Sequence, residues 1–237
     1  MTSREIQCEF RACADVDDAV NLSRFFKTDS GDYGEGDIFL GIRVPVIRKF
    51  TKRYAAELSL RSVRALLKSR YHEERLLALL IMVRQFKGAE SSKQESLYDL
   101  YLSHTAYVNN WDLVDLSAEH IVGVWLYTRK RDLLYQLAES ENLWEKRIAI
   151  LATFYFIRKN DFNDTIAIAE KLRNDKHDLI HKAVGWMLRE VGNRDRSVEE
   201  KFLKKYLSEM PRTMLRYAIE RFPEPLRLAY LNGTTLD

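Results

Sequence analysis

Arg147-Ile-Ala-Ile-Leu-Ala152 is one of five related segments that recur along this chain of 237 residues. The other four are Arg75-Leu-Leu-Ala-Leu-Leu80, Asp115-Leu-Ser-Ala-Glu-His120, Lys182-Ala-Val-Gly-Trp-Met187 and Arg216-Tyr-Ala-Ile-Glu-Arg221. In chain order, their first residues are 40, 32, 35 and 34 positions apart. Helical repeats of this length are typical of HEAT and armadillo proteins. The sequence therefore predicts an all-α fold, an α-solenoid of antiparallel helix pairs whose second helices line a concave groove.

Helical periodicity extends over most of the chain after residue 40, whereas strand patterns are scarce. We predict a single domain over residues 1–237, with helical repeats at about 40–231 and an N-terminal helix and glycine-containing loop at 14–39. The expected helices are 14–28, 45–56, 60–69, 72–87, 91–107, 110–127, 131–139, 143–158, 161–174, 177–192, 196–208, 211–221 and 224–231.

Local punctuation indicates where several helices begin. Proline suits a first helical position, and Ser, Asn or Asp suits a cap; these residues are Pro45, Pro211, Ser59, Asn110, Asn142 and Asn160 or Asp161. The loop 28–37 holds three of the nine glycines. We interpret it as a flexible connection, with substrate contact as the alternative.

Composition excludes several classes of protein. The chain is 46% hydrophobic and 31% charged with few Gly and Pro, which argues against a β-sandwich, a β-barrel or a disordered chain. The longest apolar run, 76–83, is too short for a membrane span. The first residues are charged and lack the apolar core of a secretory signal. With two cysteines, Cys8 and Cys13, expected as reduced thiols, we predict a cytoplasmic protein that makes no membrane contact.

Charge is distributed unevenly along the chain. Residues 40–90 carry 12 basic and 4 acidic residues, whereas residues 1–39 carry 4 and 9. The first position of the repeat is a cation in four copies, Arg75, Arg147, Lys182 and Arg216, and such a row would attract a polyanion. The fifth copy has Asp115. This carboxylate either pairs with a neighbouring cation or acts on something cationic.

Aromatic residues accompany these charges. Trp111 lies one helical turn before Asp115, and Trp186 one turn after Lys182, so each pair shares a helix face. Tryptophans in a helical protein are commonly core anchors, but an aromatic face also attracts a cation. His177-Asp-Leu-Ile-His181 only imitates a zinc motif, because Asp replaces Glu and no third ligand follows. We expect no metal and no cofactor.

Four segments in this order resemble the AlkD family of HEAT-like-repeat DNA glycosylases. They are Phe39-Leu-Gly-Ile-Arg-Val-Pro45, Asn110-Trp-Asp-Leu-Val-Asp115, Asn142-Leu-Trp-Glu-Lys-Arg-Ile-Ala-Ile150 and Lys182-Ala-Val-Gly-Trp-Met-Leu-Arg-Glu190. The resemblance extends from about residue 18 to residue 221. It implies excision of cationic alkylated purines, such as 3-methyladenine and 7-methylguanine, from duplex DNA.

The resemblance also implies roles for individual residues. The catalytic carboxylate of the family corresponds to Asp115, and an active-site arginine corresponds to Arg147. The two tryptophans that pack against the lesion nucleotide correspond to Trp111 and Trp186. A second arginine that contacts DNA falls on Arg189. Together with Lys182 and Arg216 from the row of cations, and with Phe25, it forms the predicted DNA-binding set. A tyrosine of the best-known members appears here as Phe25, so its hydroxyl contact is lost, and the loop 28–37 is longer than theirs.

The chemistry of a cationic purine fits these residue types. The base leaves neutral without a general acid, and positive charge passes to the deoxyribose, where Asp115 would stabilise it and orient water. Arg147 would hold a flanking phosphate and keep Asp115 ionised.

We expect a monomer whose partner is duplex DNA with alkylated bases. The alternatives are a non-catalytic paralogue that binds branched or distorted DNA and a protein-binding scaffold.

Overall fold

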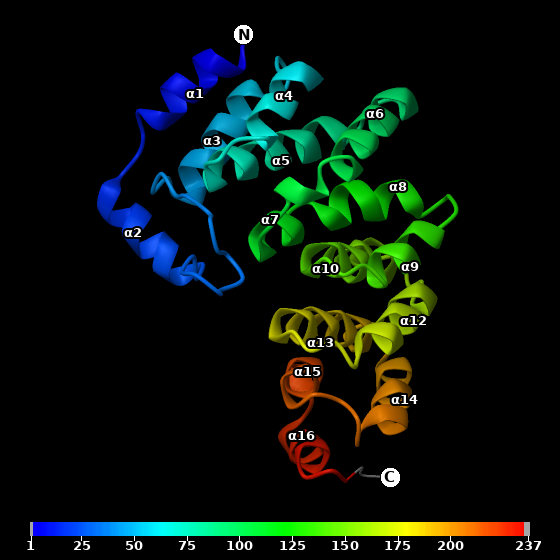
Figure 1. The fold of residues 1–237 in the computed structure, drawn as a ribbon. Helices are drawn as coiled ribbons and strands as arrows, with labels where there is room; N and C mark the ends of the chain where they lie inside the picture. The colour runs from blue at the N-terminus through cyan, green and yellow to red at the C-terminus, as the bar shows by residue number, and fades with distance from the viewer. Residues whose placement is uncertain (1, 235–237) are drawn as a thin grey trace. The chain divides into compact units, whose positions relative to one another are not determined.

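The computed structural model describes residues 2–234, and its regular elements are helices. An isolated parallel bridge between Ile38 and Tyr71 is the β-type pairing found there. The helical class predicted from the periodicity is thus confirmed. Contacts divide the chain into two compact units, Met1–Ile121 (unit 1) and Val122–Asp237 (unit 2) (Figure 1).

Unit 1 is organised around the helix α5, His72–Phe86. This helix is buried on nearly every side and packs against α3, α4, α6 and α7, as expected for a helix inside a core. The helices of this unit are α1 (Ser3–Arg11), α2 (Val16–Phe25), α3 (Val44–Tyr54), α4 (Leu60–Leu67), α5, α6 (Ser91–Leu102), the 3₁₀ helix η1 (Thr105–Tyr107) and α7 (Trp111–Asp115).

The helix α1 is absent from the sequence-based prediction, which placed the first helix at 14–28. A capping box starts it, in which the Thr2 side chain accepts from the Glu5 backbone and the Glu5 side chain accepts from the Thr2 backbone. Ile6 and Phe10, one turn apart, are fully buried on its inner face. Two apolar positions in a polar segment are a weak periodic signal, which is why the helix was missed.

The loop 28–37, interpreted from its glycines as a flexible connection, makes hydrogen bonds within unit 1. The Gly34 amide donates to the Lys27 carbonyl, and a Cβ at Gly34 would lie 2.4 Å from the Phe26 carbonyl oxygen. Glu35 accepts from the Gly31 amide inside the loop. Asp37, at the end of the loop, is buried.

Unit 2 consists of stacked helix pairs. The pairs α9–α10 and α12–α13 are followed by α14 and α15, which both pack on α13. Figure 1 shows α10, α13 and α15 following one another in one layer, with α9, α12 and α14 in the other. The elements are α8 (Val124–Leu126), α9 (Asp132–Ala138), α10 (Leu143–Ala152), α11 (Phe154–Ile157), α12 (Asn163–Leu172), α13 (Asp178–Gly192), α14 (Arg196–Tyr206), α15 (Arg212–Ala218), the 3₁₀ helix η3 (Ile219–Arg221) and α16 (Glu224–Leu231).

Close packing between the second helices requires a glycine. A Cβ at Gly185 on α13 would lie 2.4 Å from the Met214 carbonyl oxygen on α15. Such layered pairs, stacked by their second helices, are the arrangement expected of an α-solenoid.

Two predicted helices are interrupted by side-chain hydroxyls. The predicted helix 110–127 is divided into α7, a break and the π-helical turn η2 (Glu119–Gly123). In the break, the Ser117 hydroxyl donates a hydrogen bond to the Leu113 carbonyl at 2.5 Å. The predicted helix 143–158 is divided at Thr153, whose hydroxyl donates to the Ile150 carbonyl. A hydroxyl that competes for backbone partners disturbs a helix, and periodicity does not reveal it.

The predicted caps are mostly confirmed. Ser59, Asn110 and Asn142 accept from backbone amides at the starts of α4, α7 and α10. Pro45 lies in the first turn of α3, whereas Pro211 precedes α15 as its N-cap and is not its first residue. The predicted cap at Asn160 or Asp161 is wrong, since α12 begins after Phe162. Among residues 2–234, no helix has the length and apolarity needed to cross a membrane.

Candidate functional site

Trp111 and Asp115 lie at the two ends of α7, a helix of five residues in unit 1. The buried Asn110 side chain fixes its start by accepting from the Trp111 amide at 2.8 Å. Both Trp111 and Asp115 are half-buried, so each keeps part of its surface open to a ligand. The helix therefore holds an aromatic face and a carboxylate one turn apart, as the spacing predicts.

Trp111 belongs to a stack of aromatic rings. Phe26 stacks on it with ring centroids 5.2 Å apart, and Phe39 stacks on Phe26 at 5.0 Å. Phe25 meets Trp111 edge to face at 6.0 Å and is 64% exposed. A large apolar side chain with this exposure stands out in a folded chain. The structure thus places Phe25 beside Trp111, in the same unit.

A buried charge network underlies α7. The ring of His72 bridges two carboxylates, with Nδ1 3.0 Å from Oδ2 of Asp37 and Nε2 2.9 Å from Oδ2 of Asp112. Burial alone lowers the pKa of His72, but the two carboxylates outweigh it and raise the pKa to about 9. His72 is therefore protonated at neutral pH and donates to both neighbours.

Asp37 is the second centre of this network. Arg75 donates to its Oδ1 at 2.5 Å, and the side-chain amides of Asn109 and Asn110 donate to its two oxygens at 3.0 and 3.2 Å. Burial raises the pKa of Asp37, but His72 and Arg75 outweigh that effect and lower the pKa to about 2. The carboxylate joins the end of loop 28–37 to the segment that leads into α7.

Sequence reasoning missed this network. The His72 ring is buried and paired with two carboxylates, which no sequence motif indicates. Sequence reasoning placed Arg75 in a row of cations that face a polyanion, which is wrong, because Arg75 is buried and paired with Asp37. The available signals were an aspartate at the end of a glycine-containing loop and a histidine at a helix start.

In unit 2, Arg147 lies on α10 and is 5% exposed. Its Nη1 donates to the Leu179 carbonyl at 2.6 Å, on the first turn of α13. This bond fixes the guanidinium against the neighbouring repeat. Trp144, three residues earlier, is buried in the core, where the sequence allowed a core role.

Trp186 lies on α13, half-buried. Phe154 meets it edge to face at 5.8 Å, and its indole nitrogen donates to Glu190 at 3.1 Å. The four tryptophans thus divide into two kinds. Trp125 and Trp144 are buried, whereas Trp111 and Trp186, which the sequence selected for the site, both keep an exposed part.

The three remaining predicted cations lie on α13 and α15. Lys182 pairs with Asp178 at 2.7 Å, and Arg189 pairs with Glu220. Arg216 is exposed. Lys182 and Arg216 line one groove between these helices. Of the predicted site residues, Phe25, Trp111 and Asp115 therefore belong to unit 1, and the other five belong to unit 2.

The two histidines of the zinc-like motif serve the fold. His177 caps α13 by accepting from the Leu179 amide, and His181 contacts the Asp175 carbonyl through Nε2. Each bond engages one of the two nitrogens of its ring.

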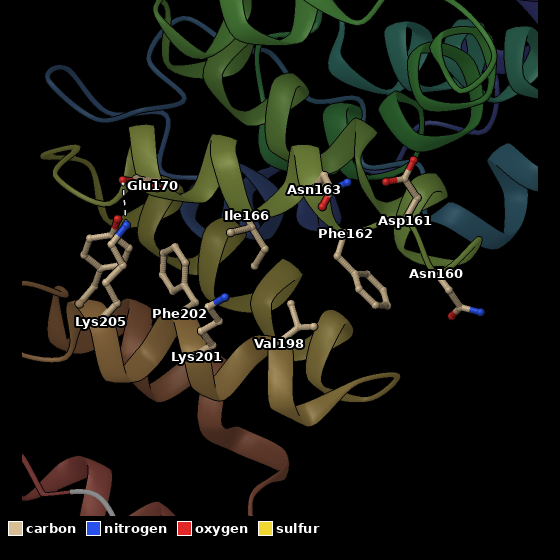
Figure 2. A pocket seen from close by; sticks show the side chains of 11 residues that line it. Asn160, Asp161, Phe162, Asn163, Ile166, Glu170, Val198, Lys201, Phe202 and Lys205 are labelled. Carbon is tan, nitrogen blue, oxygen red and sulfur yellow. Dashed lines mark ion pairs between the residues drawn. The ribbon is translucent and has the colours of Figure 1, made fainter.

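Figure 2 shows another groove of unit 2, between α12 and α14, with a volume of about 450 Å³. Lys205 on its rim pairs with Glu170 at 3.6 Å. The residues predicted for the site are not among those that line it. Its floor is apolar and is formed by Phe162, Ile166, Val198 and Phe202.

Comparison with known proteins places this chain in a family. The profile described as DNA alkylation repair enzyme matches residues 6–222. The chain belongs to the DNA alkylation repair enzyme family. This agrees with the resemblance carried by the four sequence segments.

A solved structure has the same fold as this family member. It is a predicted DNA alkylation repair enzyme from Enterococcus faecalis, with a TM-score of 0.70 and 18% sequence identity, covering 89% of this chain and 97% of that chain. At this identity the likeness concerns the fold. A search of curated proteins gives no significant match.

Proposed function

We propose that this protein is a DNA glycosylase that removes positively charged alkylated purines, of the 3-methyladenine and 7-methylguanine type, from duplex DNA. The observation that carries the proposal is Asp115 on α7, a half-buried carboxylate one turn from the half-buried Trp111. Family membership supports alkylation repair in general, and the chemistry of this pair supports glycosidic-bond hydrolysis.

The reaction needs charge stabilisation more than proton transfer. Because the alkylated base is already cationic, it departs neutral, and the deoxyribose becomes oxocarbenium-like as the N-glycosidic bond breaks. Asp115 stabilises that charge and orients the water that attacks the sugar carbon. The buried clamp of His72 on Asp112 holds α7 in place, so the carboxylate is positioned before the substrate binds.

The aromatic residues supply a second source of stabilisation. The face of Trp111 attracts a cationic sugar by roughly 0.5–2 kcal/mol, depending on desolvation, and the family resemblance assigns Trp186 to the same role. Phe25 extends the aromatic surface beside Trp111. It offers no hydroxyl, so its contribution is contact area.

Phosphate contacts come from the basic residues of unit 2. We assign the phosphate that flanks the lesion to Arg147, which is 5% exposed and oriented by the Leu179 carbonyl, so this contact requires the guanidinium to become accessible when DNA binds. Lys182, Arg189 and Arg216 bind further phosphates, which gives affinity with little dependence on base sequence.

The test is the release of 7-methylguanine from a defined duplex under single-turnover conditions at saturating enzyme. We expect release by the native protein and loss of release by Asp115→Asn, with duplex binding retained. Asp99→Asn is the matched control, an exposed aspartate on α6 of the same unit. Equal excision rates for native protein and Asp115→Asn would reject the role of Asp115.

If neither the native protein nor the variant releases base, and both bind duplex tightly, the proposal fails. The non-catalytic paralogue that binds branched or distorted DNA then becomes the better description, and branched DNA the next ligand to test.

A further inference from the structure

A groove between α13 and α15 combines cations with carboxylates. It has a volume of about 550 Å³. Arg216 on its wall is exposed. The lining residues are Asp178, Lys182, Thr213, Arg216, Tyr217 and Glu220. Both signs of charge therefore meet on a surface to which the proposed function assigns DNA phosphates.

Two of the proposed phosphate-binding cations are already held by carboxylates. The Lys182 ammonium lies 2.7 Å from Oδ2 of Asp178, one turn earlier on α13. The Arg189 guanidinium pairs with Glu220, which lies in η3 directly after α15. Both carboxylate side chains are more than half exposed, so they can move away without disturbing the core.

We propose that Asp178 and Glu220 restrain the affinity of this protein for DNA, because they occupy Lys182 and Arg189 in ion pairs that a phosphate must displace. The inference rests on the proposed function, in that it takes DNA as the ligand of this surface. The carboxylates stand where phosphate oxygens would bind, so they lower the affinity for duplex DNA through its phosphates.

The physical basis is the weakness of exposed ion pairs. Such pairs contribute little stability and are screened by salt, so exchange of a carboxylate for a phosphate is feasible. A displaced carboxylate nevertheless remains on the same surface and repels the phosphate that replaces it. Partial burial raises the pKa of Asp178, but Lys182 and Thr213 outweigh that effect and lower the pKa. Asp178 is thus a full negative charge at neutral pH.

The test compares binding of a short undamaged duplex, followed by fluorescence anisotropy over a series of salt concentrations. We expect Asp178→Asn and Glu220→Gln each to bind roughly three- to tenfold more tightly than the native protein at low salt. The plot of log K against log salt should steepen by up to about 0.9 for each variant, since one more phosphate is neutralised.

Glu209→Gln is the matched control. Glu209 is an exposed partner of Arg173 at 3.0 Å, in the same unit, and its replacement removes the same charge from an ion pair outside the groove. We expect less than about a twofold change in affinity for it. If Glu209→Gln tightens binding as much as the other two variants, the effect is one of net charge and the inference is overturned.

A double variant locates the effect at the ion pair itself. Removing the cation in Lys182→Gln should reduce the gain that Asp178→Asn produces, since no cation remains to be released and only the repulsion between Asp178 and phosphate is relieved. A gain of the same size in the Lys182→Gln background would contradict the inference. So would unchanged affinity in Asp178→Asn and Glu220→Gln, or a native protein that does not bind duplex at low salt.

Excision of 7-methylguanine, measured on the same preparations, separates this inference from the proposed function. Excision by the native protein without tighter binding by the variants rejects the inference alone. Tighter binding by the variants without excision rejects the glycosylase proposal and leaves the restraint on DNA affinity standing.

Discussion

The Nε2 atom of His72 lies 2.9 Å from Oδ2 of Asp112, in the first turn of the helix that carries Trp111 and Asp115. Replacement of Asp112 by Asn should lower the free energy of unfolding by about 2–3 kcal/mol, because a buried, charged histidine loses one of its two counter-charges. Chemical denaturation at pH 7 measures this loss. Asp99→Asn, exposed on the same unit, should change stability by less than about 0.5 kcal/mol.

The same network predicts a loss of stability in alkaline solution. The folded-state pKa of His72, about 9, exceeds its ordinary value of 6.5, so the native state binds the proton more tightly than the unfolded chain. The stabilisation that protonated His72 gives the folded state is about 3 kcal/mol. It is complete below pH 6.5 and is lost as the pH rises through 9. Urea denaturation at pH 6.5 and pH 9 measures it. A stability profile for His72→Gln that falls as steeply over this interval as the native one would contradict the assignment.

Glu199 predicts a second dependence on pH, in unit 2. It is buried at the start of α14, and a Cβ at Gly192 would lie 1.6 Å from its Oε2. Burial raises its pKa to about 8 from 4.5, so its contribution is complete below pH 4.5 and is lost as the pH rises through 8. The free energy of unfolding of Glu199→Gln should equal that of the native protein near pH 4.5 and exceed it by roughly 4 kcal/mol at pH 9. The difference between the two denaturation curves isolates this group from His72. A difference that does not change with pH would refute the assignment.

The helices follow from local pattern, whereas the support of the site does not. The spacing of apolar residues located most of the helices to within a few residues, because the buried face of a helix is formed by residues three or four positions apart in the sequence. The His72 bridge joins residues that lie 35 and 40 positions away along the chain. No periodicity specifies that a histidine at a helix start will meet one carboxylate from a loop and another from a different helix.

Arg75 is a second case in which the sequence did not reveal the partner of a buried charge. The repeat alignment correctly placed it on a second helix, but alignment gives the helix position and not the partner. Asp37, which lies in a loop outside the repeats, forms a buried ion pair with Arg75 and neutralises its charge. For Trp111 and Trp186 the sequence motif selected the two half-exposed tryptophans, although their environment became visible only in the folded chain.

Arg216 and Arg75 should therefore respond differently to substitution, although they occupy the same position in the repeat. Arg216 is exposed, so Arg216→Gln should weaken duplex binding uniformly across sequences and reduce the salt slope by about 0.9. Arg75→Gln should instead lower the free energy of unfolding, by about 3 kcal/mol, because it leaves Asp37 buried with less charge compensation. Anisotropy titrations and urea denaturation on both variants give the comparison. A loss of stability in Arg216→Gln equal to that in Arg75→Gln would show that the exposure of Arg216 does not determine its role.

Phe25 offers the sharpest comparison between stability and function. Because the side chain is 64% exposed and touches Trp111 only at its edge, Phe25→Ala should lower the free energy of unfolding by less than about 1 kcal/mol. Loss of its contact area beside Trp111 should nevertheless slow single-turnover excision of 7-methylguanine, by roughly tenfold if about 1.4 kcal/mol of transition-state contact is lost. Phe25→Tyr keeps the ring and adds a hydroxyl, so it should match or exceed the native rate. Phe26→Leu is the structural control, since Phe26 is buried between Trp111 and Phe39 and its loss should affect stability first. If Phe25→Ala excises at the native rate, Phe25 is a surface residue without a part in the reaction.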